Sequence, residues 1–354
     1  MMTSPPLVRR ARLLDWYDAQ ARVLPWRVGP ADRARELRPD PYRVWLSEVM
    51  LQQTTVPHAT AYFLDFTRRW PTVEALAAAP EAEVMAAWAG LGYYARARNL
   101  IACARAIASD HGGLFPDTEA GLLELPGVGH YTAAAVAAIA FDRAANVVDG
   151  NVERVVARLY AVDTPLPDAK PELKSLAATL VTADRPGDWA QALMDLGAVI
   201  CRPRSPLCDR CPLAEACRAR LGGAPESYPR KSPKADRPRR HGVAFVLTNN
   251  DHVALVRRPP RGLLGGMLAL PTTDWLGAPQ TSESAAAQAP AAADWRSVDP
   301  IEHVFTHFAL TLDVWRARAS VRDEAYVWLP IDEAARSLPS VFLKALRTGL
   351  SNLV

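Results

Sequence analysis

The spacing of apolar residues changes once along this chain. Residues 8–217 repeat apolar side chains at helical spacing, as in VWLSEVMLQQT and VERVVARLYAV. From His241 onward, stretches such as GVAFVLTN, HVALVRR and AYVWLP predict short strands, and VFLKALRTGL predicts a closing helix. The chain has 354 residues, which is too long for one ordinary core. We therefore predict an all-α domain over residues 1–220 and a smaller α+β domain over residues 241–354.

Pro, Gly and charged residues gather between these halves, and we predict a linker over residues 221–240. Residues 229–240 carry six Lys or Arg against one Asp. Such a segment is either a solvated tether or a strap that contacts nucleic acid. The formal charge of the whole chain is only +3, which excludes a histone-like polycation but not a local basic groove.

The sequence also indicates the cellular compartment of the protein. It has no stretch of about 20 uninterrupted apolar residues that would predict a membrane span. The N-terminal residues mix acid and base and lack a secretory apolar segment. We therefore expect a cytoplasmic protein without membrane contact, in which clustered cysteines bind metal or do chemistry more often than they form disulfides.

Four of the five cysteines, Cys201, Cys208, Cys211 and Cys217, lie in one segment with the spacing C-x6-C-x2-C-x5-C. Four thiolates from one loop can surround a tetrahedral zinc ion or the corners of an iron–sulfur cluster. The uneven spacing favours the cluster over the paired knuckles of a zinc ribbon. Cys103 stands alone in an apolar helix and is interpreted as a buried small hydrophobe.

The stretch LPGVGHYTAAAV, residues 125–136, has the form of a glycine-containing hairpin that opens a helix. Gly127 and Gly129 can adopt backbone conformations closed to other residues and allow a ligand to approach closely. Amides at a helix N-terminus favour an anion such as a DNA phosphate. The alternative is a tight turn between two helices with no ligand.

Two acidic residues lie in settings that suit catalysis. Glu48 is surrounded by apolar residues in a predicted helix, where poor solvation raises the pKa of a carboxyl group and makes it a proton donor. An exposed glutamate on a polar stripe is the alternative. Asp149 precedes a predicted helix and has two possible roles. It either caps this helix, a role that Asn151 could share, or stabilises a developing cation. A proton donor and a separate carboxylate are what glycosidic cleavage requires.

Six motifs occur together in one order: VWLSEVMLQQT, GLGYYARARNL, LPGVGHYTAAAV, VDGNVERV, MDLGAVIC and the four-cysteine loop. As a set they resemble the helix-hairpin-helix DNA glycosylases. More narrowly they are similar to the MutY adenine glycosylases, which remove adenine mispaired with 8-oxoguanine. The resemblance is dense over residues 10–217 and continues weakly to the end of the chain.

The resemblance implies a [4Fe-4S] cluster on the four cysteines, with a structural or DNA-positioning role. It also implies that Glu48 protonates adenine at N7, that Asp149 stabilises the sugar cation, and that Tyr131 and Asn151 form hydrogen bonds around that pair. Endonuclease III, a near relative, carries a lysine nucleophile where this chain has Tyr131. A phenol cannot form a Schiff base, so a monofunctional glycosylase is expected, with water completing the reaction.

The same resemblance assigns contacts to double-stranded DNA. Gln52 and Gln53 would wedge into the duplex, and Tyr93 would insert beside 8-oxoguanine unless it packs in the core. Arg96 and Arg98 would meet phosphate or remain solvated. A monomer is expected, since one chain can enclose the damaged pair.

The second half resembles the Nudix-like C-terminal domain of the same family. GLLGGMLALP and HVFTHFALTLDVW carry the similarity, whereas the acidic REXXEE core of a Nudix box is absent, so no pyrophosphatase activity is expected. The turn of Phe305, Thr306 and His307 matches the loop that recognises 8-oxoguanine. Thr306 stands where many members have serine, and it keeps the hydroxyl. The alternative is an ordinary strand with His307 packed locally.

Two other functions remain open at this point. One is a glycosylase of different specificity, such as thymine or oxidised pyrimidine removal. The other is a non-catalytic protein that binds damaged DNA. The C-terminal domain argues against the first alternative, and the presence of both Glu48 and Asp149 argues against the second.

Overall fold

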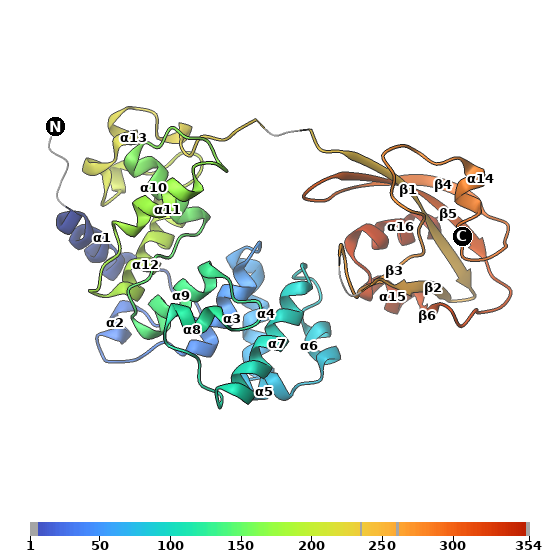
Figure 1. Ribbon diagram of the computed structural model, residues 1–354, viewed down its shortest axis with the longest axis horizontal. Helices are drawn as coiled ribbons and strands as arrows, with labels where there is room; N and C mark the ends of the chain where they lie inside the picture. Colours follow the sequence, from blue (N-terminus) through green and yellow to red (C-terminus); the bar gives the residue numbers. More distant parts are fainter. Residues whose placement is uncertain (1–5, 234–235, 260–261, 352–354) are drawn as a thin grey trace. The chain divides into compact units, whose positions relative to one another are not determined.

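The computed structural model describes residues 6–233, 236–259 and 262–351, and it divides into two compact units between Pro233 and Lys234 (Figure 1). The first unit is built from helices, and the second contains a sheet with helices packed against it. Within the described residues, no helix combines the length and the apolar character needed to cross a bilayer.

The first unit packs its helices around one continuous apolar core. Helices α3 and α9 form its centre, and α9 is buried along almost its whole length, as an alanine-rich helix without a polar face must be. The helices are α1 (Pro6–Gln20), α2 (Pro30–Arg33), α3 (Pro41–Leu51), α4 (Val56–Arg69), α5 (Val73–Ala78), α6 (Glu81–Ala87), α7 (Ala95–Asp110), α8 (Glu119–Leu123), α9 (His130–Phe141), α10 (Gly150–Tyr160), α11 (Lys170–Ala178), α12 (Pro186–Asp195) and α13 (Arg218–Leu221).

Local sequence explains where the functional helices begin. Asp40 caps α3 by accepting a hydrogen bond from the Tyr42 amide at 2.9 Å, and Pro41 supplies the fixed φ that suits a first helical position. Asp149 caps α10 in the same manner, and Gly129 precedes α9. Helix α12 continues into a π-helical turn, Leu196–Ile200, which ends at Cys201.

The first part of the predicted linker is not a free tether. Its first residue, Leu221, ends α13 (Arg218–Leu221), and Pro225–Ser227 forms a 3-10 turn. The Leu166 amide donates to the Arg230 carbonyl at 2.8 Å, and the Ser232 amide donates to the Leu166 carbonyl at 3.1 Å. Residues up to Ser232 therefore pack on the helical unit. Lys234 and Ala235, also part of the predicted linker, lie outside the described residues.

The second unit contains a mixed sheet of order β3-β2-β1-β5-β4, with β6 also paired to β2. Strand β1 runs parallel to β5, whereas the other pairs are antiparallel. The strands are β1 (Arg239–Asn249), β2 (His252–Arg257), β3 (Leu268–Ala269), β4 (Arg296–Val304), β5 (Ala309–Arg318) and β6 (Val327–Pro330).

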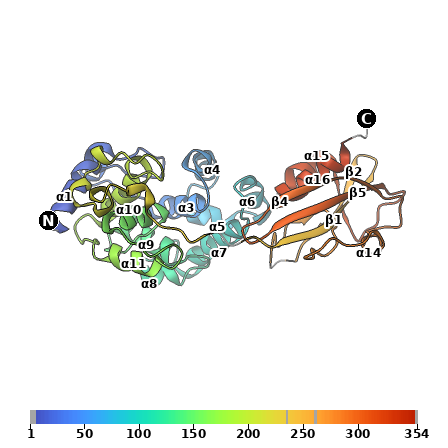
Figure 2. The ribbon, with the colours of Figure 1, turned by 90° about the horizontal axis from the view of Figure 1, so that it is seen from above.

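Helices cover both faces of this sheet (Figure 2). Ala244 and Val246 of β1 pack with α15 (Ile331–Ser337) and α16 (Ser340–Leu350). Val243 and Phe245 face the other side and pack with the short helix α14 (Ser282–Ala286). The alternation along β1 follows from the two-residue period of a strand.

Candidate active site

One cavity of about 850 Å³ in the helical unit brings together eight of the residues singled out from the sequence. They come from the end of α3, the turn before α9 and the start of α10: Glu48, Gln52, Gln53, Gly127, Gly129, Tyr131, Asp149 and Asn151. These segments are distant in the sequence, so their convergence is a product of the fold.

Glu48 lines this cavity but is itself only 6% exposed, so the exposed-glutamate alternative is wrong. Burial raises the pKa of its carboxyl group above the ordinary value of 4.5. The hydrogen bond from Tyr131 and the charge of Arg27 act in the opposite direction, and the charge of Asp149 raises the pKa further. Burial therefore favours the protonated form of this side chain more than solvent would.

Tyr131 donates its hydroxyl proton to Glu48 Oε2 at 2.7 Å. Burial raises the pKa of Tyr131 well above 10, and the charges of Glu48 and Asp149 add to this effect. The phenol therefore stays protonated and donates a hydrogen bond to the carboxyl group.

Asp149 caps α10, which is one of the two roles considered for it from the sequence. Its Oδ1 caps α10 by accepting from the Val152 amide at 2.7 Å, while Oδ2 accepts from Asn151 Nδ2 at 2.9 Å. Asn151 lies inside α10 and does not share the cap. Its Oδ1 accepts from Arg154 Nη2 at 2.8 Å, and Arg154 Nε donates to the Cys201 carbonyl at 2.8 Å. Hydrogen bonds thus fix the orientation of the carboxylate.

The hairpin before α9 presents backbone to the same cavity. Gly127 has φ +72°, and a Cβ there would lie 2.5 Å from Asn99 Cβ, so glycine is required. Gly129 has φ −96°, which any residue adopts, so its expected special conformation is wrong. No atom lies within 4 Å of a Cβ built on Gly129, and no side chain caps α9 there. The first amides of α9 therefore have no side-chain partner.

Sequence reasoning missed three charged residues beside the site. Arg22 and Arg27 line the cavity, and Asp195, at the end of α12, is fully buried behind them. Asp195 accepts from Arg27 Nη1 at 2.8 Å and from Arg22 Nε at 2.5 Å. The two arginines lie in a loop without a periodic sequence pattern. Their shared partner Asp195 is the only sign of their role, and it lies 168 residues from Arg27 in the sequence.

The residues expected to enter the duplex lie in exposed or strained turns. Gln53 is exposed with φ +58°, while Gln52 donates to Thr132 Oγ1 at 3.3 Å. Tyr93 is 58% exposed with φ +49°, so the core-packing alternative is wrong. Arg96 neither faces solvent freely nor offers its guanidinium for phosphate, because its two terminal nitrogens donate to backbone carbonyl groups.

The four clustered cysteines line a separate cavity of only about 20 Å³. Arg158, only 2% exposed, donates through Nη1 to Cys201 Sγ at 3.3 Å and to the Arg202 carbonyl at 2.7 Å. In the described part of the chain, no three His, Cys, Asp or Glu side chains form a group that could hold one metal ion. Burial raises the pKa of Cys211 to about 12. Cys103 is buried away from this loop, as expected.

In the second unit, Phe305, Thr306 and His307 form the turn between β4 and β5. The Phe305 amide donates to the Phe308 carbonyl at 2.9 Å, and both Thr306 and His307 are exposed. The strand alternative is therefore wrong. The ring of Phe305 stacks on Trp275 with centroids 5.9 Å apart, and the guanidinium of Arg240 lies 4.5 Å from the centroid of Phe308.

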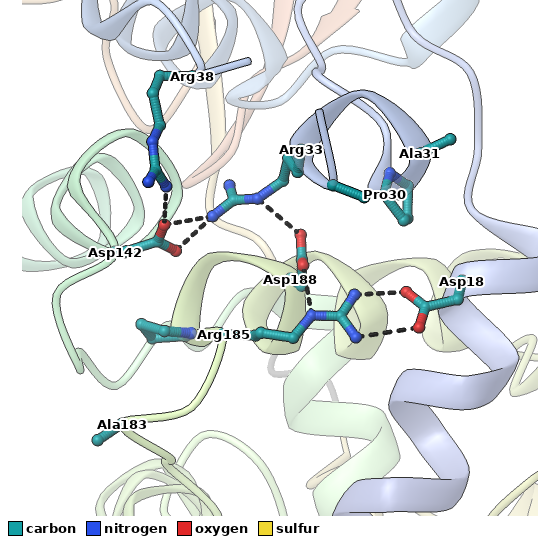
Figure 3. Close-up of a pocket in the computed structure, with 11 residues that line it drawn as sticks. Asp18, Pro30, Ala31, Arg33, Arg38, Asp142, Ala183, Arg185 and Asp188 are labelled. Atoms are coloured by element: carbon teal, nitrogen blue, oxygen red, sulfur yellow. Dashed lines mark hydrogen bonds and ion pairs between the residues drawn. The ribbon is translucent and has the colours of Figure 1, made fainter. Parts of the chain in front are cut away.

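A third cavity of the helical unit, of about 650 Å³, is lined mainly by charged residues that pair with one another (Figure 3). The ion pairs run from Asp18 through Arg185 to Asp188, and from Asp188 through Arg33 to Asp142 and Arg38. Each carboxylate meets a guanidinium, which leaves no excess charge for a ligand. This chain of ion pairs joins α1, α2, the end of α9 and α12 and is structural.

We expect Asp188→Asn to lower the free energy of unfolding by about 3 kcal/mol, because removing one partner leaves buried charge unpaired. Asp188 is 3% exposed and lies 2.8 Å from Arg185 Nε and 3.3 Å from Arg33 Nε. Asp18→Asn is the matched control, and at an exposed side chain it should cost less than about 1 kcal/mol. Chemical denaturation measures both, and equal losses would contradict the assignment.

Comparison with known proteins defines the class of this chain. The profile of the HhH-GPD superfamily of base excision DNA repair proteins matches residues 46–179, and a NUDIX domain profile matches residues 243–348. A helix-hairpin-helix domain followed by a Nudix-like domain is thus confirmed as the fold class.

Similar proteins narrow this class. Human adenine DNA glycosylase is 37% identical over 86% of this chain and 66% of its own length. The rat enzyme is 35% identical over 91% and 72%, and the Mycobacterium tuberculosis enzyme is 40% identical over 70% and 77%. The chain belongs to the adenine DNA glycosylases, hydrolases of N-glycosyl bonds that act in base excision repair, and the resemblance to MutY is confirmed.

Solved structures agree on the fold of the helical unit. A thermostable thymine-DNA glycosylase is 32% identical, with a TM-score of 0.54 over 61% of this chain and 97% of that one. A trapped endonuclease III–DNA covalent intermediate is 23% identical, with a TM-score of 0.50 over 63% of this chain and 99% of that one, and shows the fold alone.

Proposed function

We propose that this chain removes adenine paired with 8-oxoguanine or guanine in double-stranded DNA. The observation that carries the proposal is the buried Glu48, hydrogen-bonded to Tyr131 in the cavity that also holds Asp149. The similar adenine DNA glycosylases support the target base, since the similarity extends over as much as 95% of the chain. The chain acts as a monomer on the duplex.

The first step is extrusion of adenine into the cavity, because a glycosidic bond cannot be attacked within the base stack. Glu48 then donates its proton to N7 of the adenine, which withdraws electrons from the glycosidic bond as it breaks. A general acid of this kind contributes roughly 10²- to 10⁴-fold in rate. Tyr131 keeps the carboxyl group in position through its hydrogen bond.

The second step places positive charge on the sugar, and the carboxylate of Asp149 stabilises it. Asn151 and the Val152 amide hold the two oxygens of Asp149, so the negative charge is oriented before the reaction begins. Water attacks the oxocarbenium-like sugar and yields an abasic site. Tyr131 forms no covalent bond with the sugar, so the enzyme is monofunctional.

The remaining predicted residues bind DNA. The amides at the start of α9, beside Gly127 and Gly129, would take a phosphate, and Gln52, Gln53 and Tyr93 would enter the duplex. The exposed turn of Phe305, Thr306 and His307 would read 8-oxoguanine, with Trp275 supporting it from beneath.

The cavity lined by the four cysteines suits a [4Fe-4S] cluster. All four ligands would be thiols, and the buried guanidinium of Arg158 donates to the sulfur of one of them. Cys201, Cys208, Cys211 and Cys217 would hold it, and bound there it would brace the loop. Purified protein should contain iron and acid-labile sulfide in equal amounts. Replacing Cys211 by alanine should lower both, and unchanged iron content would contradict the assignment.

Excision rates on four duplexes test the function. Enzyme in excess is mixed with adenine opposite 8-oxoguanine, guanine or thymine, and with thymine opposite guanine. We expect adenine release from the first two duplexes only. Release of thymine from the last duplex would instead support the pyrimidine specificity suggested by the thymine glycosylase neighbour.

The pH dependence of the excision rate should follow the protonation of Glu48. Only its protonated form is a donor, so the rate should fall as the pH rises through a pKa above 4.5. The Tyr131 hydrogen bond lowers this pKa, so Tyr131→Phe should move the alkaline limb to higher pH. Single-turnover rates across pH measure the limb. An alkaline limb that moves to lower pH, or does not move, would contradict the proposed effect of the Tyr131 hydrogen bond on Glu48.

A further inference from the structure

Arg96, in the first turn of α7, reaches back to the end of α3. Its Nη1 donates to the carbonyl groups of Val49 at 3.0 Å, Met50 at 3.2 Å and Gln52 at 2.6 Å. Helix α3 ends at Leu51, so the carbonyl groups of Val49 and Met50 belong to its last turn, where intrahelical donors run out, and Gln52 is its C-cap. One guanidinium nitrogen therefore closes the helix that carries Glu48 and holds the turn that follows it.

The other terminal nitrogen of Arg96 holds a second turn. Nη2 donates to the carbonyl groups of Leu91 at 3.0 Å and Gly92 at 3.2 Å, directly before Tyr93. The guanidinium carbon also lies 5.3 Å from the ring centroid of Trp88 and 5.5 Å from that of Tyr93. This second turn therefore rests on the same planar group by hydrogen bonds and by stacking.

Both turns have backbone conformations that need support. Gln53 and Tyr93 each have positive φ, at +58° and +49°, and such conformations persist only when their surroundings fix them. Arg96 supplies that support to both at once. Its Nε is buried without a hydrogen-bond partner. The position of the side chain therefore satisfies the carbonyl groups of the two turns and leaves one of its own donors unsatisfied.

We infer that Arg96 is a positioning residue that joins the Gln52–Gln53 turn and the Tyr93 turn into one rigid unit, so that both enter the duplex together. The inference rests on the proposed function, which assigns these turns to the duplex. Contact with phosphate is the alternative role for an arginine here, but both terminal nitrogens are already engaged. Lysine cannot replace it, because a single ammonium lacks the planar fork that spans two segments.

Hydrogen exchange on the free protein tests the coupling without DNA. In Arg96→Lys and Arg96→Ala, amides at residues 52–54 and 91–94 should both exchange roughly 10-fold faster or more. Arg105→Lys is the matched control, since this exposed arginine of the same helix donates to one carbonyl group, that of Ala77. Faster exchange in one turn alone, or wild-type protection in the lysine variant, would overturn the inference.

Base extrusion gives the second readout. A duplex with 2-aminopurine opposite 8-oxoguanine fluoresces when that base leaves the stack. At saturating protein, Arg96→Lys should reduce the extruded fraction roughly 10- to 100-fold, while cooperative unfolding and the Arg105→Lys control stay like the wild type. Full extrusion by the lysine variant would overturn the inference. If wild-type protein fails to excise adenine while the exchange result holds, only the proposed function fails.

Discussion

Glu48→Gln should abolish adenine excision while leaving duplex binding intact. Glutamine keeps the shape and the contact with Tyr131 but has no proton to donate at N7. The loss of the general acid alone predicts a fall of roughly 10²- to 10⁴-fold in the single-turnover rate. The rate is measured with enzyme in excess, and binding is measured on the same duplex by fluorescence anisotropy.

Stability provides a check on the same variant. Because burial raises the pKa of Glu48, the folded protein resists ionisation of this group, and wild-type stability falls as pH rises from 4.5 through the raised pKa. Glu48→Gln should remove the part of this pH-dependent loss of stability that comes from the ionisation of Glu48. Glu83→Gln, at an exposed position on α6, is the control and should change neither rate nor stability. A Glu48→Gln enzyme that still excises adenine would rule out this acid.

Asp149→Asn should lose excision by a factor of roughly 10² to 10³, because it removes the negative charge beside the sugar cation. Asparagine remains a good N-cap, so the hydrogen bond to the Val152 amide can persist and the fold should be preserved. The single-turnover rate and the free energy of unfolding are measured on the same preparation.

Asp149→Ala separates the two roles of this residue. It removes both the charge and the cap, so it should lose activity as Asp149→Asn does and also about 1 kcal/mol of stability. If Asp149→Asn retained full activity and only Asp149→Ala failed, the cap would be the important role. The proposed stabilisation of the cation would then be wrong.

Much of this architecture could be predicted from local sequence. The change from helical to strand periodicity divides the chain, and capping residues such as Asp40 and Asp149 begin the helices that carry the site. Strand β4 was missed because Pro300 interrupts its alternation at a bulge between Val298 and Ile301. Helix α15 was missed because it is short and follows β6 directly.

The contacts within the site could not be predicted, because they join distant segments. Tyr131 and Glu48 are 83 residues apart, and only the packing of α3 on α9 brings the hydroxyl to the carboxyl group. Arg96 was interpreted by its charge, whereas its role follows from carbonyl groups that no sequence pattern marks. Asp195 was overlooked because its partners lie in a loop.

The most direct test of the central claim is single-turnover cleavage of a labelled duplex with one 8-oxoguanine:adenine pair, analysed with and without hot alkali. We expect strand breaks on the adenine strand only after alkali, since hydrolysis leaves an intact abasic strand and Tyr131 cannot act as a lyase nucleophile. Breaks without alkali would contradict the monofunctional mechanism. No breaks in either lane, with binding retained, would contradict adenine excision itself.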